Sequence, residues 1–355
     1  MSYVSAIKYL DDTGAVKAPH FDAEGMRVVA QDYLMSLAEG DITNHTQWSK
    51  IGYTPTMTTT ESDIWSLAGV YTFPTAPAQM DVISSNAVDF GLAIFSGTAS
   101  GGNSTSLLDA TKDFTAGTAV APGDCVILDR AGTTPEWGFV TSGTATGLYF
   151  SNGFSSTGSA SGRSYWVLDK SAFSGTHAII YEYLDGNYAT HTEIVIMKGT
   201  SATNTLNTDV FRIQSFRVIA TGNLNRASGN LSIRLAGGAS TYSYITAGFT
   251  RARNTAYTVP AGKTLYVVQF CAAYGYTANN AVHYARLYIR ANVELATGFN
   301  AQSIFYPYAE VITANTSQLV NLQVPIKFPA KTDIKASGIA SVAGIATIAL
   351  RGWQE

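Results

Sequence analysis

Charged side chains are scarce in this chain. Only 13% of its 355 residues are Asp, Glu, Lys or Arg, and the formal net charge is -3. Proteins that bind nucleic acids need clustered lysine and arginine to displace counterions from phosphates. The composition therefore argues against a nucleic acid as a partner. Surfaces of such low charge are more typical of proteins that pack against other subunits.

Cysteine and long apolar runs are almost absent as well. The only two cysteines, Cys125 and Cys271, fall in different predicted modules. This excludes the disulfide framework of a small secreted scaffold and favours two free, buried thiols. No apolar run reaches the roughly 20 residues of a membrane span, and the N-terminus does not resemble a secretory signal. We therefore expect no membrane partner.

Motifs for catalysis and metal binding are also missing. No Gly-x-Ser-x-Gly elbow is present, and no Gly-rich stretch continues into Gly-Lys-Ser/Thr. Asp109 and Asp113 have the character of paired glycosidase carboxylates, but turn positions explain them better. No HxxxH or HxH pair occurs among the histidines, which are His20, His45, His177, His191 and His283. We expect a non-enzymatic protein with no catalytic residue, no cofactor and no metal site.

What the chain does contain is strand periodicity. Residues 286–295 alternate in polarity, with Leu287, Ile289 and Val293 on one parity and Arg286, Arg290 and Glu294 on the other. This predicts a strand whose apolar set is buried and whose polar set faces solvent or a neighbouring subunit. A one-residue shift of parity between Ile213 and Phe216 predicts a β-bulge. Similar segments fill the chain after residue 65, so the fold class is mainly β.

Turn-rich segments divide these strands into modules. Clusters of Gly, Ser and Thr at residues 97–102 and 155–162 bracket five short strand candidates. They predict a small β-barrel over residues 91–172 that is inserted into a loop of another domain. Residues 46–90 and 173–235 then form a first β-sandwich, and residues 236–355 form a second, jelly-roll-like sandwich.

One helix is predicted, in an N-terminal arm of residues 1–45. Asp22 is a suitable N-cap, and Gly40 ends the apolar periodicity after Glu39. An isolated helix of this length is marginal in water, so its apolar face needs a partner. The residues predicted to form this assembly interface are Met26, Val29, Tyr33 and Leu37. A helix that merely covers the end of the first sandwich is an equal alternative.

Aromatic residues are concentrated in the predicted barrel. A barrel of this size must fill its core with large side chains, so most of them are expected inside. Trp137, Phe154 and Trp166 are the candidates for exposed contacts at its rim. Exposed aromatic rings of this kind stack on carbohydrate.

Two passages resemble virion proteins of tailed bacteriophages. Residues 258–268 contain Pro260-Ala261-Gly262-Lys263, which is similar to the Pro-x-Gly-Lys turn that opens a strand in many phage jelly-roll proteins. Residues 108–126 are similar to a small β-barrel module that recurs in phage particle proteins. The likeness covers most of residues 60–350. It implies a structural protein of the virion, assembled in the host cytoplasm, that decorates the head or is attached to the tail.

Three functions remain open at this point. The first is a capsid decoration or head-associated protein that binds the major capsid protein or other virion proteins and forms a homo-oligomer, with a trimer expected. The second is a tail or fibre receptor-binding protein whose aromatic insertion contacts a host surface glycan. Copy number per particle separates these two. The third is a polysaccharide-degrading enzyme, which would need clustered carboxylates in a groove.

Overall fold

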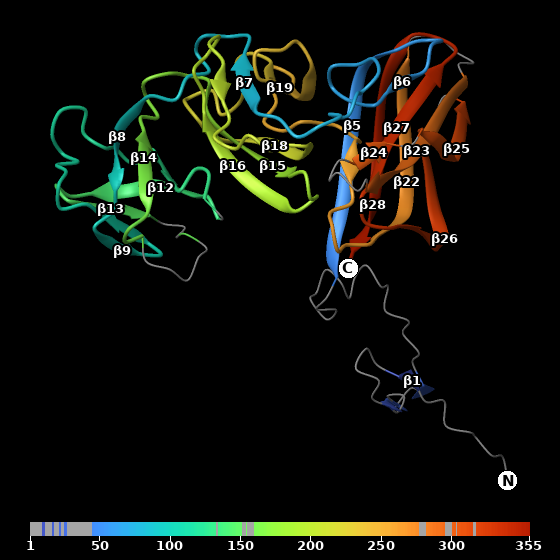
Figure 1. Cartoon of the computed structure of the whole chain (residues 1–355), viewed down its shortest axis with the longest axis horizontal. Coiled ribbons are helices and arrows are strands. Elements are labelled where there is room, and N and C mark those ends of the chain that lie inside the picture. Colours follow the sequence, from blue (N-terminus) through green and yellow to red (C-terminus); the bar gives the residue numbers. More distant parts are fainter. Residues whose placement is uncertain are drawn as a thin grey trace.

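A computed structural model describes residues 45–132, 134–150, 154, 160–276, 282–294, 300–302, 304–314 and 317–355, together with four two-residue strands nearer the N-terminus. Beyond those four strands, the described chain forms three β-rich bodies that lie in a row: a barrel, a sandwich and a jelly roll (Figure 1). All strand pairs are antiparallel, and the described residues contain no helix. The prediction of a mainly β protein is confirmed.

The predicted N-terminal helix is not supported by the structure. Strand β3 (Phe21–Asp22) pairs with β4 (Gly25–Met26), and β1 (Tyr9–Leu10) pairs with β2 (Val16–Lys17). Asp22 and Met26 therefore lie in a hairpin instead of the first turns of a helix. Gly25 disfavours a helix at this point, and apolar periodicity alone stabilises a helix poorly without a packing surface. Val29, Tyr33 and Leu37 lie outside the described residues.

The C-terminal body has the strand order of a jelly roll. One sheet runs β26-β22-β28-β5 and the other runs from β25 through β23 to β27, which pairs with both β6 and β21. Counted along the chain, with β6 and β21 sharing the second position, the sheets read 1-8-3-6 and 2-7-4-5, which is the jelly-roll order. The strands are β5 (Thr46–Met57), β6 (Ser62–Asp63), β21 (Tyr257–Thr258), β22 (Leu265–Tyr276), β23 (Val282–Glu294), β25 (Tyr306–Ala314), β26 (Gln318–Phe328), β27 (Thr332–Ala340) and β28 (Gly344–Gln354), with β24 (Asn300–Gln302) paired to the end of β23.

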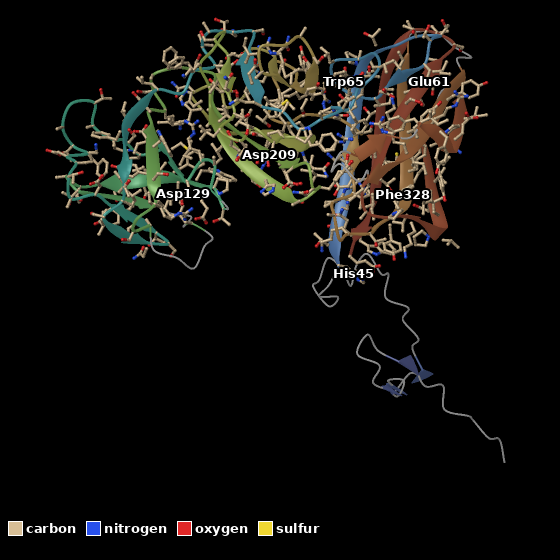
Figure 2. The ribbon with its side chains drawn as sticks, viewed as in Figure 1. His45, Glu61, Trp65, Asp129, Asp209 and Phe328 are labelled. Atoms are coloured by element: carbon tan, nitrogen blue, oxygen red, sulfur yellow. The ribbon has the colours of Figure 1, made fainter. Side chains whose placement is uncertain are left out.

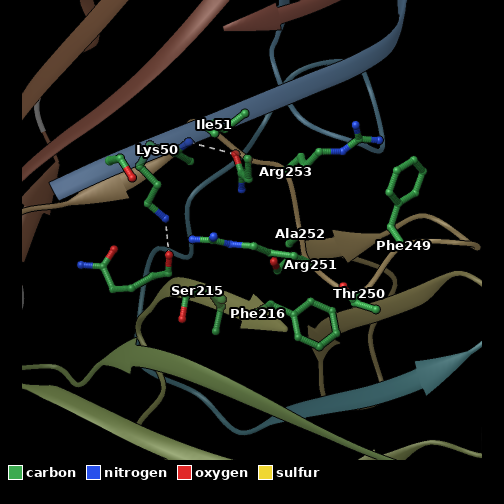
Figure 3. Close-up of a pocket in the computed structure, with 15 residues that line it drawn as sticks. Lys50, Ile51, Ser215, Phe216, Phe249, Thr250, Arg251, Ala252 and Arg253 are labelled. Carbon is green, nitrogen blue, oxygen red and sulfur yellow. Dashed lines mark hydrogen bonds between the residues drawn. The ribbon is translucent and has the colours of Figure 1, made fainter. Parts of the chain in front are cut away.

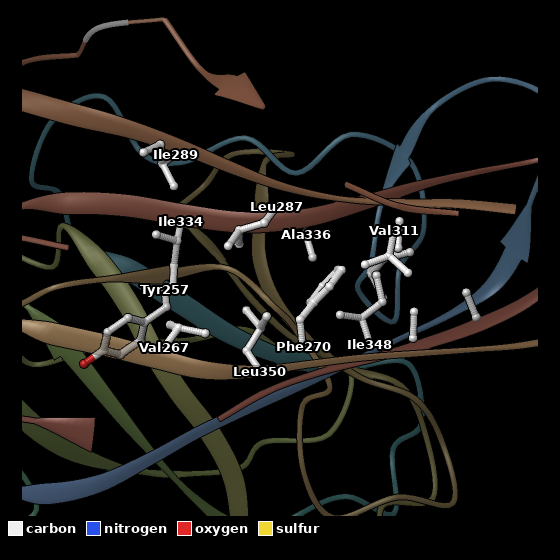
Figure 4. Packing of buried hydrophobic residues seen from close by; sticks show 14 of the residues in the cluster. Tyr257, Val267, Phe270, Leu287, Ile289, Val311, Ile334, Ala336, Ile348 and Leu350 are labelled. Atoms are coloured by element: carbon white, nitrogen blue, oxygen red, sulfur yellow. The ribbon is translucent and has the colours of Figure 1, made fainter. Parts of the chain in front are cut away.

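The core of the jelly roll lies between these two sheets, where side chains from both meet (Figure 4). Leu287 and Ile289 of β23 are 1% and 5% exposed, which confirms the predicted inward parity. Arg286 faces outward and pairs with Glu310. The prediction that Arg290 faces solvent or a neighbouring subunit is wrong, because this residue is only 9% exposed. The side chains of Val293 and Glu294 lie outside the described set.

Replacing Ile289 by alanine is expected to lower the free energy of unfolding by about 2–5 kcal/mol, because the lost methyl groups leave a cavity in this core. Urea unfolding at equilibrium measures the loss. Ile345→Ala in β28 is a matched control, since Ile345 is 46% exposed. A surface change of this kind stays within about 0.5 kcal/mol. Equal effects of the two substitutions would contradict the assignment.

The other two bodies are inserted at the second strand position of the jelly roll. Strand β6 ends at Asp63 and β21 begins at Tyr257, yet both pair with β27 at neighbouring registers. The chain thus leaves the jelly roll after Asp63 and returns at Tyr257. Residues 46–63 were predicted in the first sandwich, and this is wrong, because β5 pairs with β28 along its length. Alternating polarity predicts a strand without identifying its distant partner.

The middle body is a sandwich of two sheets. One has the order β16-β15-β18 and the other β17-β7-β19-β20. Its strands are β7 (Met80–Ser84), β15 (Thr176–Leu184), β16 (Thr190–Ile196), β17 (Thr203–Asn204), β18 (Arg212–Thr221), β19 (Leu231–Leu235) and β20 (Thr241–Ile245). The register between β15 and β18 shifts between Ile213 and Ser215, which confirms the predicted bulge.

The third body is a seven-stranded sheet with the order β8-β14-β11-β12-β13-β10-β9. Its outermost strands β8 and β9 are consecutive in the chain, separated only by Ala99 and Ser100, so one bent segment closes the sheet into a barrel. Its strands are β8 (Ala93–Thr98), β9 (Gly101–Asn103), β10 (Ser106–Leu108), β11 (Cys125–Leu128), β12 (Glu136–Gly143), β13 (Gly147–Phe150) and β14 (Ser164–Leu168). The two connections to the sandwich are adjacent, since the amide of Gly175 donates to the carbonyl of Val88 at 3.2 Å.

Barrel and sandwich share a hydrophobic cluster. Cys125, Ile127 and Leu168 of the barrel pack against Ile180 and other residues on the outer face of the β16-β15-β18 sheet. The opposite face of the same sheet forms the inner core of the sandwich. Strand β15 is therefore buried on both faces, which explains its nearly continuous apolar run.

Candidate functional site

The acidic, histidine and cysteine side chains of the described residues are dispersed over the fold. In this part of the chain, no group of three or more His, Cys, Asp or Glu side chains lies close enough to hold a metal ion. Glu61, Asp129 and Asp209, labelled in Figure 2, lie in three different bodies. Nor does the described chain include a helix long and apolar enough to cross a membrane.

The titratable nucleophiles and bases have structural surroundings. Both cysteines are free; Cys125 is buried and Cys271 is half-buried. Burial raises the pKa of the Cys125 thiol, which opposes formation of a reactive thiolate. Burial lowers the pKa of His177, whose Nε2 lies 2.8 Å from the carbonyl of Phe173. His191 instead lies 3.1 Å from Asp185 at the end of the β15-β16 hairpin.

Asp89 is a fully buried carboxylate that organises loops of the sandwich. It accepts hydrogen bonds from the hydroxyl of Ser84 at 2.5 Å and from the amides of Thr176 and Gly229 at 2.7 Å each. The amide of Ser228 adds a fourth bond at 2.9 Å. All of its acceptor capacity is used within the fold, which leaves no lone pair for a substrate.

A buried ion cluster joins the jelly roll to the sandwich. Asp333 of β27 is 0% exposed and accepts from Nε of Arg212 at 3.1 Å and Nε of Arg290 at 2.9 Å. Thr258 of β21 donates its hydroxyl to the same carboxylate at 2.5 Å. Burial alone would raise the pKa of Asp333, but the two guanidiniums hold it below its usual range. The junction between the two bodies is therefore held by a buried, charge-balanced cluster.

A cationic cleft lies beside this junction, between strand β5 of the jelly roll and strand β18 of the sandwich (Figure 3). Its volume is about 240 Å³. Lys50 and Arg251 point toward one another across it, and the Lys50 amine donates to the carbonyl of Gln214. Arg253 lies 4.0 Å from the ring centre of Tyr53 and 3.9 Å from that of Phe249.

The pKa of Lys50 is lowered to about 8, chiefly by burial; Glu182 opposes this change and the neighbouring Arg251 adds to it. In the unfolded chain the same amine titrates near 10.5. The unfolded state therefore binds the proton more tightly than the folded state. Stability must rise with pH from about 8 to 10.5, and the penalty for burying the charge is fully present below pH 8.

We expect Lys50→Met to remove this dependence. The free energy of unfolding of the wild type, relative to the variant, should rise by at most about 1.4 kcal/mol per pH unit in this window, and by less if water screens the amine. Urea unfolding at neutral pH and near pH 9.5 measures the change. The exposed Lys263→Met serves as control. An identical difference between wild type and Lys50→Met at both pH values would contradict the assignment.

The edge strands of the jelly roll carry a candidate assembly surface. In the described structure β25 pairs only with β23, and β26 only with β22, so each leaves one edge without a strand. Large apolar side chains on and beside these strands are exposed: Ile304 83%, Tyr306 48%, Tyr308 50%, Ile312 55%, Leu319 54% and Val324 78%. Exposed apolar groups that gather along free strand edges are typical of association surfaces. Sequence periodicity did not identify them, because it does not show which strands end a sheet.

The aromatic residues predicted at the barrel rim have different surroundings. The prediction that Phe154 is an exposed contact is wrong, because this residue is only 5% exposed. Its ring centre lies 4.9 Å from that of Phe150. Trp137 and Trp166 are half-buried between barrel and sandwich. The guanidinium carbon of Arg217 lies 5.1 Å from the ring centre of Trp137, and that of Arg130 lies 5.2 Å from the ring centre of Trp166. The large aromatics that are exposed on the barrel are instead Phe139 and Tyr149, at 44% and 41%.

Comparisons with known proteins return little. No protein-family model matches the chain, and no curated protein sequence matches it. Among solved structures, that of the infectious bursal disease virus Gt strain is 10% identical with a TM-score of 0.17, covering 87% of this chain and 74% of that one. The VP2 subviral particle of the same virus is 8% identical with a TM-score of 0.16, covering 87% and 75%. Such low TM-scores carry no argument about fold or function.

Proposed function

We propose that this chain is a non-enzymatic structural protein of a virion. Its role is that of a capsid decoration or head-associated protein, which binds the major capsid protein or another shell component and self-associates as a homo-oligomer. A trimer is the expected state. We place the protein in the virion, after assembly of the particle in the host cytoplasm.

The single observation that carries this proposal is the apolar surface along β25 and β26. A monomer in water gains nothing from exposing side chains such as Ile304 at 83% and Val324 at 78%. Burial of apolar area stabilises an interface by roughly 25 cal/mol per Å² before the costs of association. In the described structure, each of these strands has one backbone edge without a partner strand, and this edge can pair with a strand of another subunit.

Two further features support the assembly role. The bodies are joined through the buried Asp333 cluster at one junction and the shared apolar cluster at the other. Such junctions hold a broad surface in one shape, which lowers the entropy cost of binding. The sequence resemblance to phage virion proteins favours the same role.

The experiment is a triple substitution on this surface, Tyr306→Ser, Ile312→Ser and Val324→Ser. We expect loss of self-association in size-exclusion chromatography with light scattering, and loss of binding to particles that lack the protein. Leu206→Ser is the control, because Leu206 is 55% exposed on the sandwich, outside this surface. Unchanged oligomeric state and full particle occupancy in the triple variant would overturn the proposal.

The alternative is a tail or fibre protein that binds a host receptor. The exposed rings of Phe139 and Tyr149 on the barrel favour it, since such rings can contact a glycan. Quantitative mass spectrometry of purified particles separates the two roles. A decoration protein is present in numbers comparable to the shell protein, whereas a tail protein is present in far fewer copies.

A further inference from the structure

A second cavity, of about 580 Å³, lies between the barrel and the sandwich. It is formed where the chain enters the barrel at Phe90 and Gly91, and where β14, β16 and β17 approach one another. Its polar lining comes from Arg130, Trp166, Lys198, Thr203 and Asn204. This volume falls in the range of about 300–1,000 Å³ that is usual for small-ligand sites.

The charge of this cavity is positive. Arg130 and Lys198 line it, and no Asp or Glu is among its lining residues. Burial lowers the pKa of Arg130, and the negative charge of Glu193 opposes this change. Glu193 is itself fully buried and accepts from Tyr181 and from the amide of Leu206. Glu193 therefore balances part of the charge of Arg130, and Lys198 together with the remaining charge of Arg130 is left to attract an anion from solution.

Two polar atoms at this cavity have no hydrogen-bond partner in the described structure. They are Nε of Arg130 and the hydroxyl of Thr203, whose side chain belongs to a residue that is 8% exposed. A buried donor without a partner costs about 1–3 kcal/mol, and native proteins rarely leave one. Both atoms are closed to solvent, so they lie behind the cavity wall and are not binding groups of the open cavity.

The third feature is an aromatic ring. Trp166 is half-buried, lines the cavity, and has the guanidinium of Arg130 at 5.2 Å from its ring centre. An aromatic ring offers an apolar platform for the C–H face of a sugar, while an amide group such as that of Asn204 bonds sugar hydroxyls. A simple inorganic anion would use the cations and leave this platform unused.

We propose that this cavity binds an acidic saccharide, a sugar unit that carries a carboxylate. The carboxylate pairs with Arg130 and Lys198, the sugar ring packs on Trp166, and its hydroxyls bond Asn204. This inference goes beyond the proposed assembly role and does not depend on it, because the cavity lies in a different part of the molecule from β25 and β26.

The test is isothermal titration of the purified full chain with two acidic sugars, 3′-sialyllactose and glucuronic acid, and with neutral lactose and glucose as their matched controls. We expect saturable binding of at least one acidic sugar and about tenfold weaker binding of its neutral counterpart, the loss typical of one charge-assisted contact. Added salt should weaken the acidic ligand further. No binding of either acidic sugar, or equal binding of acidic and neutral sugars, would overturn the proposal.

Variants assign the binding to this cavity. Lys198→Gln changes an exposed side chain, so the fold is kept, and affinity should fall about tenfold. Trp166→Ala should abolish binding, whereas Trp137→Ala should retain it, because Trp137 has a similar position under Arg217 but does not line this cavity. Unchanged affinity in Lys198→Gln, or inorganic phosphate competing as strongly as the sugar, would show that no saccharide site exists here. None of these measurements involves particles, so their outcome is independent of the assembly test.

Discussion

Replacing Asp333 by alanine is expected to lower the free energy of unfolding by about 3–5 kcal/mol, because it leaves two buried guanidiniums without their counter-charge. Arg212 is 1% exposed and Arg290 is 9% exposed, so water cannot take the place of the carboxylate. This loss of stability should weaken mainly the junction between the two bodies, since Arg212 belongs to the sandwich and Asp333 to the jelly roll. The two bodies of the variant should then unfold in separate transitions.

Calorimetry and urea unfolding measure this effect. Glu310→Gln is the control, because its partner Arg286 forms a surface pair, and such pairs contribute about 0–1 kcal/mol. The double variant Asp333→Ala with Arg212→Met should recover part of the loss, since it removes one of the uncompensated charges. A loss below about 1 kcal/mol for Asp333→Ala would mean that the cluster is hydrated and contributes little.

Local pattern predicted most of the strands correctly, for physical reasons. Strand β23 alternates because one face meets the core, so Leu287 and Ile289 were correctly expected to be buried. The bulge beside Ile213 was visible as a shift of that alternation. Strand existence and parity are encoded in neighbouring residues, and short-range periodicity therefore reports them.

Partners across the sheet could not be predicted in this way. Strand β5 joins β28, about 300 residues later in the chain, and nothing within residues 46–57 encodes that choice. The same limit explains Arg290. Its parity and charge predicted an exposed residue. In the structure, Asp333 of the neighbouring strand β27 and Arg212 of the sandwich enclose it.

The candidate sites were even harder to predict from the sequence, because each is made of residues from distant segments. Phe154 was expected at the surface and instead packs on Phe150 in the barrel core. Trp166 was predicted as an exposed rim contact and is instead half-buried beside Arg130, which only the fold brings to the same cavity. The aromatic ring is visible in the sequence, whereas its position beside a cation appears only in three dimensions.

Removing the barrel should convert a buried face of the sandwich into an exposed one. A chain in which Asp89 is joined to Ser174 through a short Gly/Ser linker keeps the sandwich connections, because Gly175 already bonds Val88. However, Ile180, Ile194 and Ile196 pack against the barrel and are at most 8% exposed. We expect this deletion variant to aggregate, since three adjacent isoleucines on one sheet face become accessible to other molecules.

The same deletion combined with Ile180→Thr, Ile194→Thr and Ile196→Thr should be soluble and folded. Threonine retains the β-branched shape that suits a strand while making the newly exposed face polar. Near-UV circular dichroism and a cooperative thermal transition measure folding, and light scattering measures aggregation. Adding Ile179→Thr is the matched control, because Ile179 points to the inner core of the sandwich, and this change should unfold it. If the triply substituted deletion variant is unfolded, the barrel is an integral part of the sandwich core and not an independent insertion.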